Sequence, residues 1–435
     1  MNQKARRVAI LHYTSPPIVG GVEAVMADHA RLFAARGYWV EVIAGRGPLP
    51  DDAPPGVSTI IAPLLDSKNP RLLALNAALD RGELPADFAL YEEELFQQLQ
   101  DLLQGYSTCI VHNALTLHKN LPLTAALTRL SACSAVKFIS WCHDLAWTNP
   151  LYAEVLHPGY PWSLLKTTAS AITYVAISPQ RQQEILETFQ PPLTPEVVPV
   201  IPNGIDLAEF LGIGAETSQV IKAAQLDQAR SEGALFFLLP ARITRRKNIE
   251  LGIRVIAALK ELGQNPRLVV TGPPGPHNPK NDLYLHELLA LREELEVASE
   301  VVFLMEKWVD PTGVSRTLSD QVINELYRYS DALFFPSSQE GFGIPLLEAA
   351  LLHLPIFCSD LEPFRQIAAD LPHYFRLNES PPTIARFIVE QLSQNPYHLL
   401  RRAVIKNNLW DNIFEKEIEP LLALVNSEEV ASKVG

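Results

Sequence analysis

The sequence predicts an α/β protein built from two Rossmann-like domains, each with a doubly wound parallel sheet. Three observations support this fold class. The chain has 435 residues, which is more than a single hydrophobic core usually holds. Short apolar runs typical of buried strands alternate with amphipathic helical patterns in both halves. Residues 201–232 lack this alternation and separate the two series, so we expect the domains to join near residue 206.

The amino-terminal half opens with a β-loop-α-β unit. Residues 6–14, RRVAILHYT, have a strand pattern and lead into the turn-rich SPPIVGG. A helix is predicted over 22–37, ending at Gly37 as its C-cap, and residues 38–45 form the next strand. The leucine-rich residues 63–105 are expected to be helical. Further strands are expected at 108–114, 136–144, 171–178 and 196–206.

The carboxyl-terminal half repeats this alternation. A helix from about 249 to 262 is expected to follow its first strand. Strands are predicted at 235–242, 267–274, 300–305, 331–336 and 355–360. Doubly wound sheets bind ligands at the carboxyl ends of their strands, so the loops after these strands are the first place to look for functional residues.

The composition argues against several classes of partner. The net charge of −13 argues against nucleic-acid binding, which needs a basic face, and disfavours tight binding to an anionic membrane. No apolar run is long enough to span a bilayer. The start, MNQKARRVAILHY, resembles a first strand more than a signal peptide. The cysteines lack metal or redox spacing, and we expect buried thiols in a reducing cytoplasm at Cys109, Cys133, Cys142 and Cys358.

A glycine loop follows the strand predicted at 331–336. Gly341 and Gly343 open the turn, and Pro345 suits the first turn of a helix, where its missing N–H costs nothing. We therefore expect a helix that begins near Ile344. The backbone N–H groups at such a helix start form an anion site.

Two glutamates flank this anion site. Glu340 lies in the loop, and Glu348 lies about one turn into the helix. Carboxylates accept hydrogen bonds from hydroxyl groups, so the segment suits a ligand that carries both phosphates and neutral hydroxyls, such as a nucleotide sugar. The alternative is structural: a glutamate near a helix start can merely complement the helix dipole.

A basic turn follows the strand at 235–242, in the segment PARITRRKN. Arg242 and Lys247 are five residues apart across this turn and can bracket a pyrophosphate. The alternative is a solvated basic turn, which is the interpretation we favour for Arg245 and Arg246.

Five segments, in this order, resemble a known family. They are PPIVGGVE in the first loop, CHD at 142–144, VIPNGID at 200–206, ARITRRKN at 241–248 and EGFGIPLLE at 340–348. Together they resemble the retaining nucleotide-sugar glycosyltransferases of family four, and the resemblance covers nearly the whole chain. It implies the GT-B fold, in which two Rossmann-like domains face each other across a cleft.

The resemblance also implies a domain organisation. Residues 1–206 would form the acceptor-binding domain and residues 207–405 the nucleotide-sugar-binding domain. Residues 406–435, which contain NLWDNIFEKEIEPLLALV, would form a helix that crosses back to the amino-terminal domain.

Roles for individual residues follow from the same resemblance. Arg242 and Lys247 would hold the donor diphosphate, and Glu340 and Glu348 would bind hydroxyls of the sugar and of the ribose. His143 would lie beside the reacting sugar; without the resemblance, a histidine bonded to Asp144 is the simpler interpretation. The implied catalytic residues are His143, Arg242, Lys247 and Glu340. The implied donor-binding residues are Gly20, Gly21, Arg242, Lys247, Glu340, Gly341, Phe342, Gly343, Ile344 and Glu348.

The implied mechanism needs neither a side-chain nucleophile nor a bound cofactor. The acceptor would attack the front face of the sugar with retention, and the departing phosphate would help to deprotonate it. The sequence has no Asp-x-Asp triplet, the usual metal cue of the other large glycosyltransferase fold. No metal site is therefore expected, and Mg²⁺ is not expected to be essential.

The leading interpretation is a retaining hexosyltransferase that uses UDP-glucose or GDP-mannose and a small soluble or glycan acceptor. A nucleotide-sugar epimerase of the same fold and a non-catalytic binding protein are the alternatives. An insertion at 305–320 replaces a segment that normally helps to hold the base, so the base stays open. Trp308 within it either stacks on a base or packs in the core. The sequence also leaves the oligomeric state open.

Overall fold

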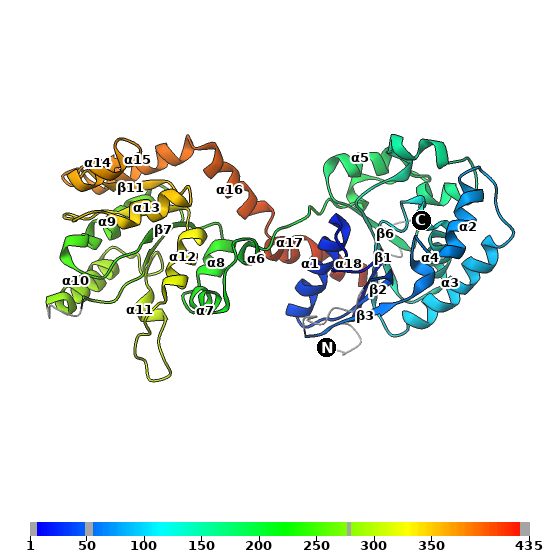
Figure 1. Ribbon diagram of the computed structural model, residues 1–435, viewed down its shortest axis with the longest axis horizontal. Helices are drawn as coiled ribbons and strands as arrows, with labels where there is room; N and C mark the ends of the chain where they lie inside the picture. The colour runs from blue at the N-terminus through cyan, green and yellow to red at the C-terminus, as the bar shows by residue number, and fades with distance from the viewer. Residues whose placement is uncertain (1–6, 48–54, 276–279, 427–435) are drawn as a thin grey trace. The chain divides into compact units, whose positions relative to one another are not determined.

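The computed structural model describes residues 7–47, 55–275 and 280–426, so residues 1–6 of the predicted start and 427–435 of the predicted last helix lie outside it. The chain divides into two compact units (Figure 1). Unit 1 is Met1–Gly204 with Trp410–Gly435, and unit 2 is Ile205–Leu409. Each contains a six-stranded parallel sheet flanked by helices, which confirms the predicted fold class. The cleft between two facing domains stays a prediction.

The sheet of unit 1 has the strand order β3-β2-β1-β4-β5-β6. The neighbouring strands all pair in parallel. Its order reverses between β1 and β4, which is where doubly wound sheets bind ligands. The strands are β1 Arg7–Thr14, β2 Trp39–Arg46, β3 Val57–Ile61, β4 Thr108–His112, β5 Lys137–Cys142 and β6 Ile172–Ala176.

The two faces of this sheet hold separate cores. Along β1, Val8 and Ile10 pack against α1 and the carboxyl-terminal helices, whereas Ala9 and Leu11 pack on the opposite face. This alternation follows from the two-residue period of a strand. The helices are α1 Gly21–Ala35, α2 Pro70–Leu79, α3 Phe88–Leu102, α4 Leu121–Cys133, α5 Pro179–Thr188, α17 Trp410–Ile413, a π-helical turn Phe414–Ile418 and α18 Glu419–Asn426. Short 3₁₀ turns lie at Pro63–Leu65, His118–Asn120, Ala146–Thr148, Pro150–Val155, Trp162–Lys166 and Pro195–Val197.

Unit 2 has the strand order β12-β11-β10-β7-β8-β9, again parallel throughout. The order reverses between β7 and β10. The strands are β7 Leu235–Leu239, β8 Pro266–Val270, β9 Val301–Phe303, β10 Ala332–Phe335, β11 Ile356–Ser359 and β12 His373–Phe375. The helices are α6 Leu207–Phe210, α7 Ala215–Ala223, α8 Leu226–Ser231, the 3₁₀ turn η8 Arg245–Lys247, α9 Ile249–Glu261, α10 Lys280–Glu294, α11 Leu304–Lys307, α12 Asp320–Tyr329, α13 Ile344–Leu351, α14 Glu362–Ala368, α15 Pro381–Ser393 and α16 Pro396–Asn407.

The strand predicted at 196–206 is wrong. Among the described residues, a single isolated bridge, Ala176↔Val200, joins this segment to the edge strand β6. Prolines at 195, 199 and 202 remove the backbone donors that a ladder needs. The sequence interpretation also missed the edge strands β3 and β12, whose residues are mostly half-buried and lack a long apolar run.

Two further details of the sequence interpretation are settled by burial. Cys133, at the end of α4, is exposed, so the expectation that all four thiols are buried is wrong. Trp308 is buried in the core of unit 2, and Arg316 covers its ring at 5.1 Å. Its position therefore favours packing over stacking on a base.

Among the described helices, none has the length and apolar character that a membrane span requires.

Candidate functional site

Two loops meet at the switch point of the unit 2 sheet. The loop after β7 forms η8, which carries Arg246 and Lys247. The loop after β10 carries Glu340 and leads into α13. The N–H of Ser338 donates to the carbonyl of Arg246 at 2.8 Å, which ties the two loops together. Parallel pairing of β7 with β10 thus brings together residues more than ninety positions apart in the sequence.

The carboxylate of Glu340 is the centre of this site. Its Oε1 accepts hydrogen bonds from Nζ of Lys247 and from the Ser337 hydroxyl, the latter at 2.9 Å. Its Oε2 accepts from Nη1 of Arg246 at 2.8 Å. The Arg246 side chain is 51% exposed, as in the solvated turn that the sequence left open for it, but its contact with Glu340 was not predicted. Arg245 instead pairs with Glu287 on the exposed surface.

Burial and charge act against each other at this ion pair. Burial acts to raise the pKa of Glu340, but hydrogen bonds and charges from Lys247, Ser337 and Arg246 outweigh it, and the pKa lies below its ordinary value. For Lys247, burial lowers the pKa and the bond to Glu340 only partly offsets this. The Lys247 Nζ also lies 4.5 Å from the centre of the Phe335 ring. A buried cation therefore lies beside a half-buried carboxylate.

The glycine loop ends where the sequence predicts, with α13 beginning at Ile344. Gly343 has a φ of 116°, and a Cβ there would lie 2.8 Å from the Phe364 ring, so only glycine fits without rearrangement. Gly341 has open space around it, and Phe342 and Ile344 are exposed. The exposed helix start leaves room for a ligand at these amides.

Glu348 lies on the first turns of α13 and has a partner that the sequence did not reveal. The hydroxyl of Tyr327, on α12, donates to its Oε2 at 2.6 Å. Burial, this bond and the charge of Glu348 together raise the pKa of Tyr327 above its ordinary value, so the phenol stays a donor.

Arg242 is exposed in the loop after β7, and its side chain makes no ion pair or hydrogen bond within the described ranges. The backbone of Gly272 lies close to this loop, since a Cβ at that glycine would lie 2.7 Å from the Arg242 Cα. Arg242 thus lies on the same loop as Lys247. In the described part of the chain, its guanidinium is not among the groups that donate to Glu340.

Gly20 and Gly21 lie in unit 1 at the start of α1, directly after the loop from β1. Gly20 has extended backbone and precedes the helix, and Gly21 has open space where a side chain would be. Glu23, in the first turn, accepts a hydrogen bond from Thr14. The glycines expose backbone at the carboxyl edge of β1.

His143 follows β5 and is buried at the same edge of the unit 1 sheet. Its Nε2 lies 2.9 Å from Nδ1 of His112, the last residue of β4. The side-chain oxygen of Asn113 accepts hydrogen bonds from the backbone N–H groups of His143 and Asp144, at 2.8 and 3.0 Å. The partner of the His143 ring is thus His112 and not Asp144, whose carboxylate lies near Asn113 and Arg181.

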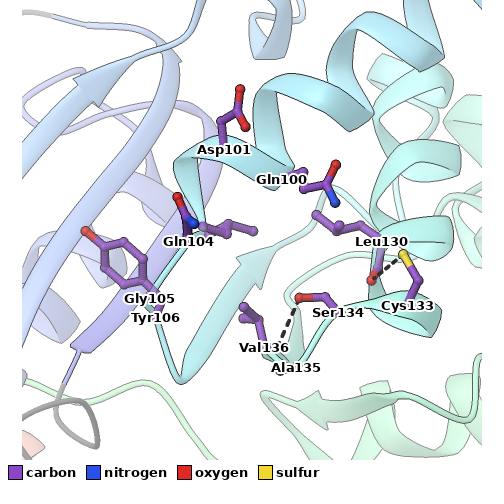
Figure 2. A pocket seen from close by; sticks show the side chains of 11 residues that line it. Gln100, Asp101, Gln104, Gly105, Tyr106, Leu130, Cys133, Ser134, Ala135 and Val136 are labelled. Atoms are coloured by element: carbon purple, nitrogen blue, oxygen red, sulfur yellow. Dashed lines mark hydrogen bonds between the residues drawn. The ribbon is translucent and has the colours of Figure 1, made fainter.

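A pocket of about 480 Å³ lies near the amino-terminal ends of β4 and β5 in the unit 1 sheet (Figure 2). Its walls come from the end of α3, the end of α4 and the loops that precede β4 and β5, including Tyr106, Cys133 and Ser134. His112 ends β4 and His143 follows β5, so both lie at the opposite, carboxyl ends of these strands. The pocket is therefore not part of the candidate site.

Sequence reasoning missed several residues that hold the predicted ones in place. They are His112, Asn113, Arg246, Tyr327 and Ser337. His112, Asn113 and Ser337 are polar residues at or just after the end of an apolar strand, which was an available signal, whereas Arg246 and Tyr327 carry no such signal.

Residues 222–407 match the family model described as Glycosyl transferases group 1. A mannosylglucosylglycerate synthase of Thermotoga maritima is 23% identical over 381 residues, covering 82% of this chain and 82% of the relative. A serotype-specific mannosyltransferase WbdA of Escherichia coli is 42% identical over 78 residues, covering 18% of this chain and 9% of the relative. A crystal structure of a glycosyltransferase from Rickettsia africae aligns with a TM-score of 0.39 and 14% identity, covering 97% of this chain and 99% of that one. The family model thus falls within unit 2, which carries Lys247 and Glu340.

Proposed function

Because residues 222–407 match the model of the group 1 glycosyl transferases, we propose that the chain belongs to this family and moves a hexose from a nucleotide diphosphate sugar to a hydroxyl group of an acceptor, with retention at the anomeric carbon. The observation that carries this proposal is the cluster around Glu340. Two cations and a carboxylate meet at the switch point of the unit 2 sheet, beside the start of α13.

The transfer breaks the bond between the anomeric carbon and a phosphate oxygen. Negative charge grows on the departing diphosphate, and positive charge grows on the sugar ring. Lys247, with Arg242 and the backbone amides at Gly341–Ile344, stabilises the diphosphate more as its charge develops, which lowers the barrier. Arg246 belongs to the same group of cations by its contact with Glu340.

The acidic residues bind the neutral part of the donor. Glu340 accepts hydrogen bonds from sugar hydroxyls, and Glu348 accepts them from the ribose, with Tyr327 orienting its carboxylate. When the diphosphate binds, Lys247 and Arg246 donate hydrogen bonds to it in place of some of those they donate to Glu340. The oxygens of Glu340 then become available to the sugar hydroxyls. Gly20 and Gly21 let backbone approach the diphosphate, and His143 acts at the reacting sugar.

We propose UDP-glucose or GDP-mannose as the donor. The names of the Thermotoga and Escherichia relatives both refer to mannosyl transfer, which favours mannose as the transferred sugar. We propose a small soluble or glycan acceptor, no bound cofactor, and Mg²⁺ as dispensable. The free cysteines support a reducing compartment, for which we propose the cytoplasm.

The test is nucleotide release from a panel of UDP-, GDP- and ADP-sugars, with and without pooled small acceptors. We expect release from one donor, stimulated by acceptor and lost in Glu340→Ala. Glu287→Ala is the matched control, because it removes a glutamate that pairs with the neighbouring Arg245 on the surface. NMR of the product gives the anomeric configuration.

The same assay separates the alternatives. Conversion of the sugar without any acceptor would indicate an epimerase. Thermal stabilisation by a nucleotide sugar without any turnover would indicate a binding protein, and an inverted anomeric centre would overturn the retaining mechanism.

A further inference from the structure

Four buried histidines gather at the carboxyl edge of the unit 1 sheet. We call them the histidine cluster: His12 on β1, His29 on α1, His112 on β4 and His143 after β5. The described residues contain no group of three or more His, Cys, Asp or Glu side chains arranged to hold a metal ion. Burial lowers the pKa of every member, to about 4 for His12 and His143. Each imidazole is therefore neutral near pH 7, with one N–H and one bare nitrogen.

For His12, His112 and His143, the position of the ring proton can be read from the hydrogen-bond partners, whereas neither ring nitrogen of His29 has a partner in the described part of the chain. Nδ1 of His12 lies 2.8 Å from the carbonyl oxygen of His112, and a carbonyl only accepts, so His12 carries its proton on Nδ1. His112 and His143 share one hydrogen bond, between Nδ1 and Nε2, and their rings are stacked at 5.2 Å. One of these two nitrogens carries the proton.

The shared proton lies either on Nδ1 of His112 or on Nε2 of His143, and the other ring nitrogen of His112 decides between these two arrangements. Its Nε2 is fully buried and has no hydrogen-bond partner in the described part of the chain. A proton there would be an orphaned buried donor, which is rarer in proteins than an unsatisfied acceptor. The proton of His112 therefore belongs on Nδ1, where it is donated to Nε2 of His143.

We propose that His112 is a positioning residue that holds His143 in the Nδ1–H tautomer. His143 then presents an N–H donor at Nδ1, which makes no hydrogen bond within the described ranges. Asn113 fixes the backbone of the same residue, so consecutive residues at the end of β4 hold His143 by its ring and by its main chain. The placement of that donor at a sugar oxygen rests on the proposed function, whereas the tautomer does not.

The first experiment reads the tautomer directly. Long-range ¹H–¹⁵N correlation spectra of the full chain at neutral pH distinguish a protonated from a bare nitrogen in each ring, and His143→Gln assigns the signals. We expect His143 to carry its proton on Nδ1, and we expect His112→Leu to abolish that preference. A wild-type His143 protonated on Nε2 would overturn the proposal, whatever the enzyme transfers.

The second experiment measures the consequence for turnover. His112→Leu is expected to lower kcat by at least about tenfold with little change in the donor KM, as for other residues that orient a catalytic imidazole. His112→Asn keeps an N–H near the position of Nδ1 and is expected to restore most of the loss. His29→Phe, which alters another buried member of the cluster without bonding to His143, is the control for folding. Equal losses in the Leu and Asn variants, at equal thermal stability, would contradict the positioning role.

Discussion

The carboxylate of Glu340 receives three donors, and this residue-scale arrangement constrains the proposed chemistry most. Lys247 and Arg246 come from one loop and Ser337 from the same loop as the glutamate. A charged group taken out of water needs such partners. The two cations are therefore held in place before any ligand binds, and under the proposed function a diphosphate would pair with them without a rearrangement of the loops.

Lys247→Ala should lower turnover by roughly two to three orders of magnitude and weaken donor binding, because it removes a donor aimed at the leaving charge. Initial rates at varied donor concentration measure both effects. Arg245→Ala is the matched control, since its partner is Glu287 and not Glu340. Unchanged turnover in a folded Lys247→Ala protein would remove this lysine from the site.

Glu348→Gln should raise the donor KM, because the amide is a poorer acceptor for ribose hydroxyls than the carboxylate. Tyr327→Phe should do the same to a smaller extent, up to roughly tenfold, since it removes the bond that orients the carboxylate. Tyr329→Phe serves as a control, because its hydroxyl donates to the carbonyl of Leu226 instead. An effect confined to the acceptor KM would contradict the assignment of Glu348 to the ribose.

At the scale of elements, the strand order of each sheet creates the site. In unit 2, β7 and β10 are neighbours, so the basic turn and the glycine loop meet. In unit 1, β1, β4 and β5 are consecutive in the sheet, so three of the four members of the histidine cluster come from neighbouring strands. Neutral, desolvated imidazoles at such an edge make the stability of the unit depend on pH.

Unit 1 should lose stability as the pH falls below about 6.5. Burial lowers the pKa of His29 to about 3 and of His12 and His143 to about 4 in the folded state, so the unfolded state binds more protons. Their contribution is present above the unfolded pKa and is lost as the pH falls towards those folded values. The free energy of unfolding should fall by up to about 1.4 kcal/mol per pH unit for each histidine.

Denaturant titrations at pH 7.5 and 5.5 test this, because carboxylates titrate mainly below that window. His29→Phe should show a smaller drop between the two pH values than wild type. If the unfolding free energy of both proteins is the same at pH 7.5 and 5.5, the buried imidazoles do not stay neutral as argued.

At the scale of the whole molecule, the chain leaves unit 1 after Gly204 and returns to it at Trp410. Within unit 2, the entering and leaving segments pair at Ile205 and Leu409. The returning residues complete the core of unit 1: the indole N–H of Trp410 donates to the carboxylate of Asp28, and Phe414 packs edge-on against Phe33. Unit 1 is therefore incomplete without the end of the chain.

Phe414→Ala should destabilise unit 1 by about 3–5 kcal/mol, the usual cost of removing a buried aromatic ring. Leu424→Ala, on the same segment but 55% exposed, should change stability by less than about 0.5 kcal/mol. Thermal or denaturant unfolding of both variants measures the difference. Equal stability of the two would mean that the returning helices do not support the core.

The sequence by itself determined the fold class, most strands and the start of α13. Buried parallel strands are local apolar runs, and Gly341, Gly343 and Pro345 act on the backbone within a few residues. The sequence does not predict the edge strands β3 and β12, because half-buried strands carry no long apolar run. Residues 196–206 have the apolar residues of a strand, but Pro199 and Pro202 prevent a ladder there.

Only the tertiary structure decided which side chains meet. The pairs Lys247–Glu340, Tyr327–Glu348 and His112–His143 join separate segments, and the sequence gives no sign of these contacts. The physical reason is that the apolar residues of a strand predict its own burial. Which strand lies beside it in the sheet depends instead on the crossover connections. The sequence could place the candidate site residues at the ends of strands. Their hydrogen-bond partners, and therefore their protonation states, depend on which strand ends lie side by side.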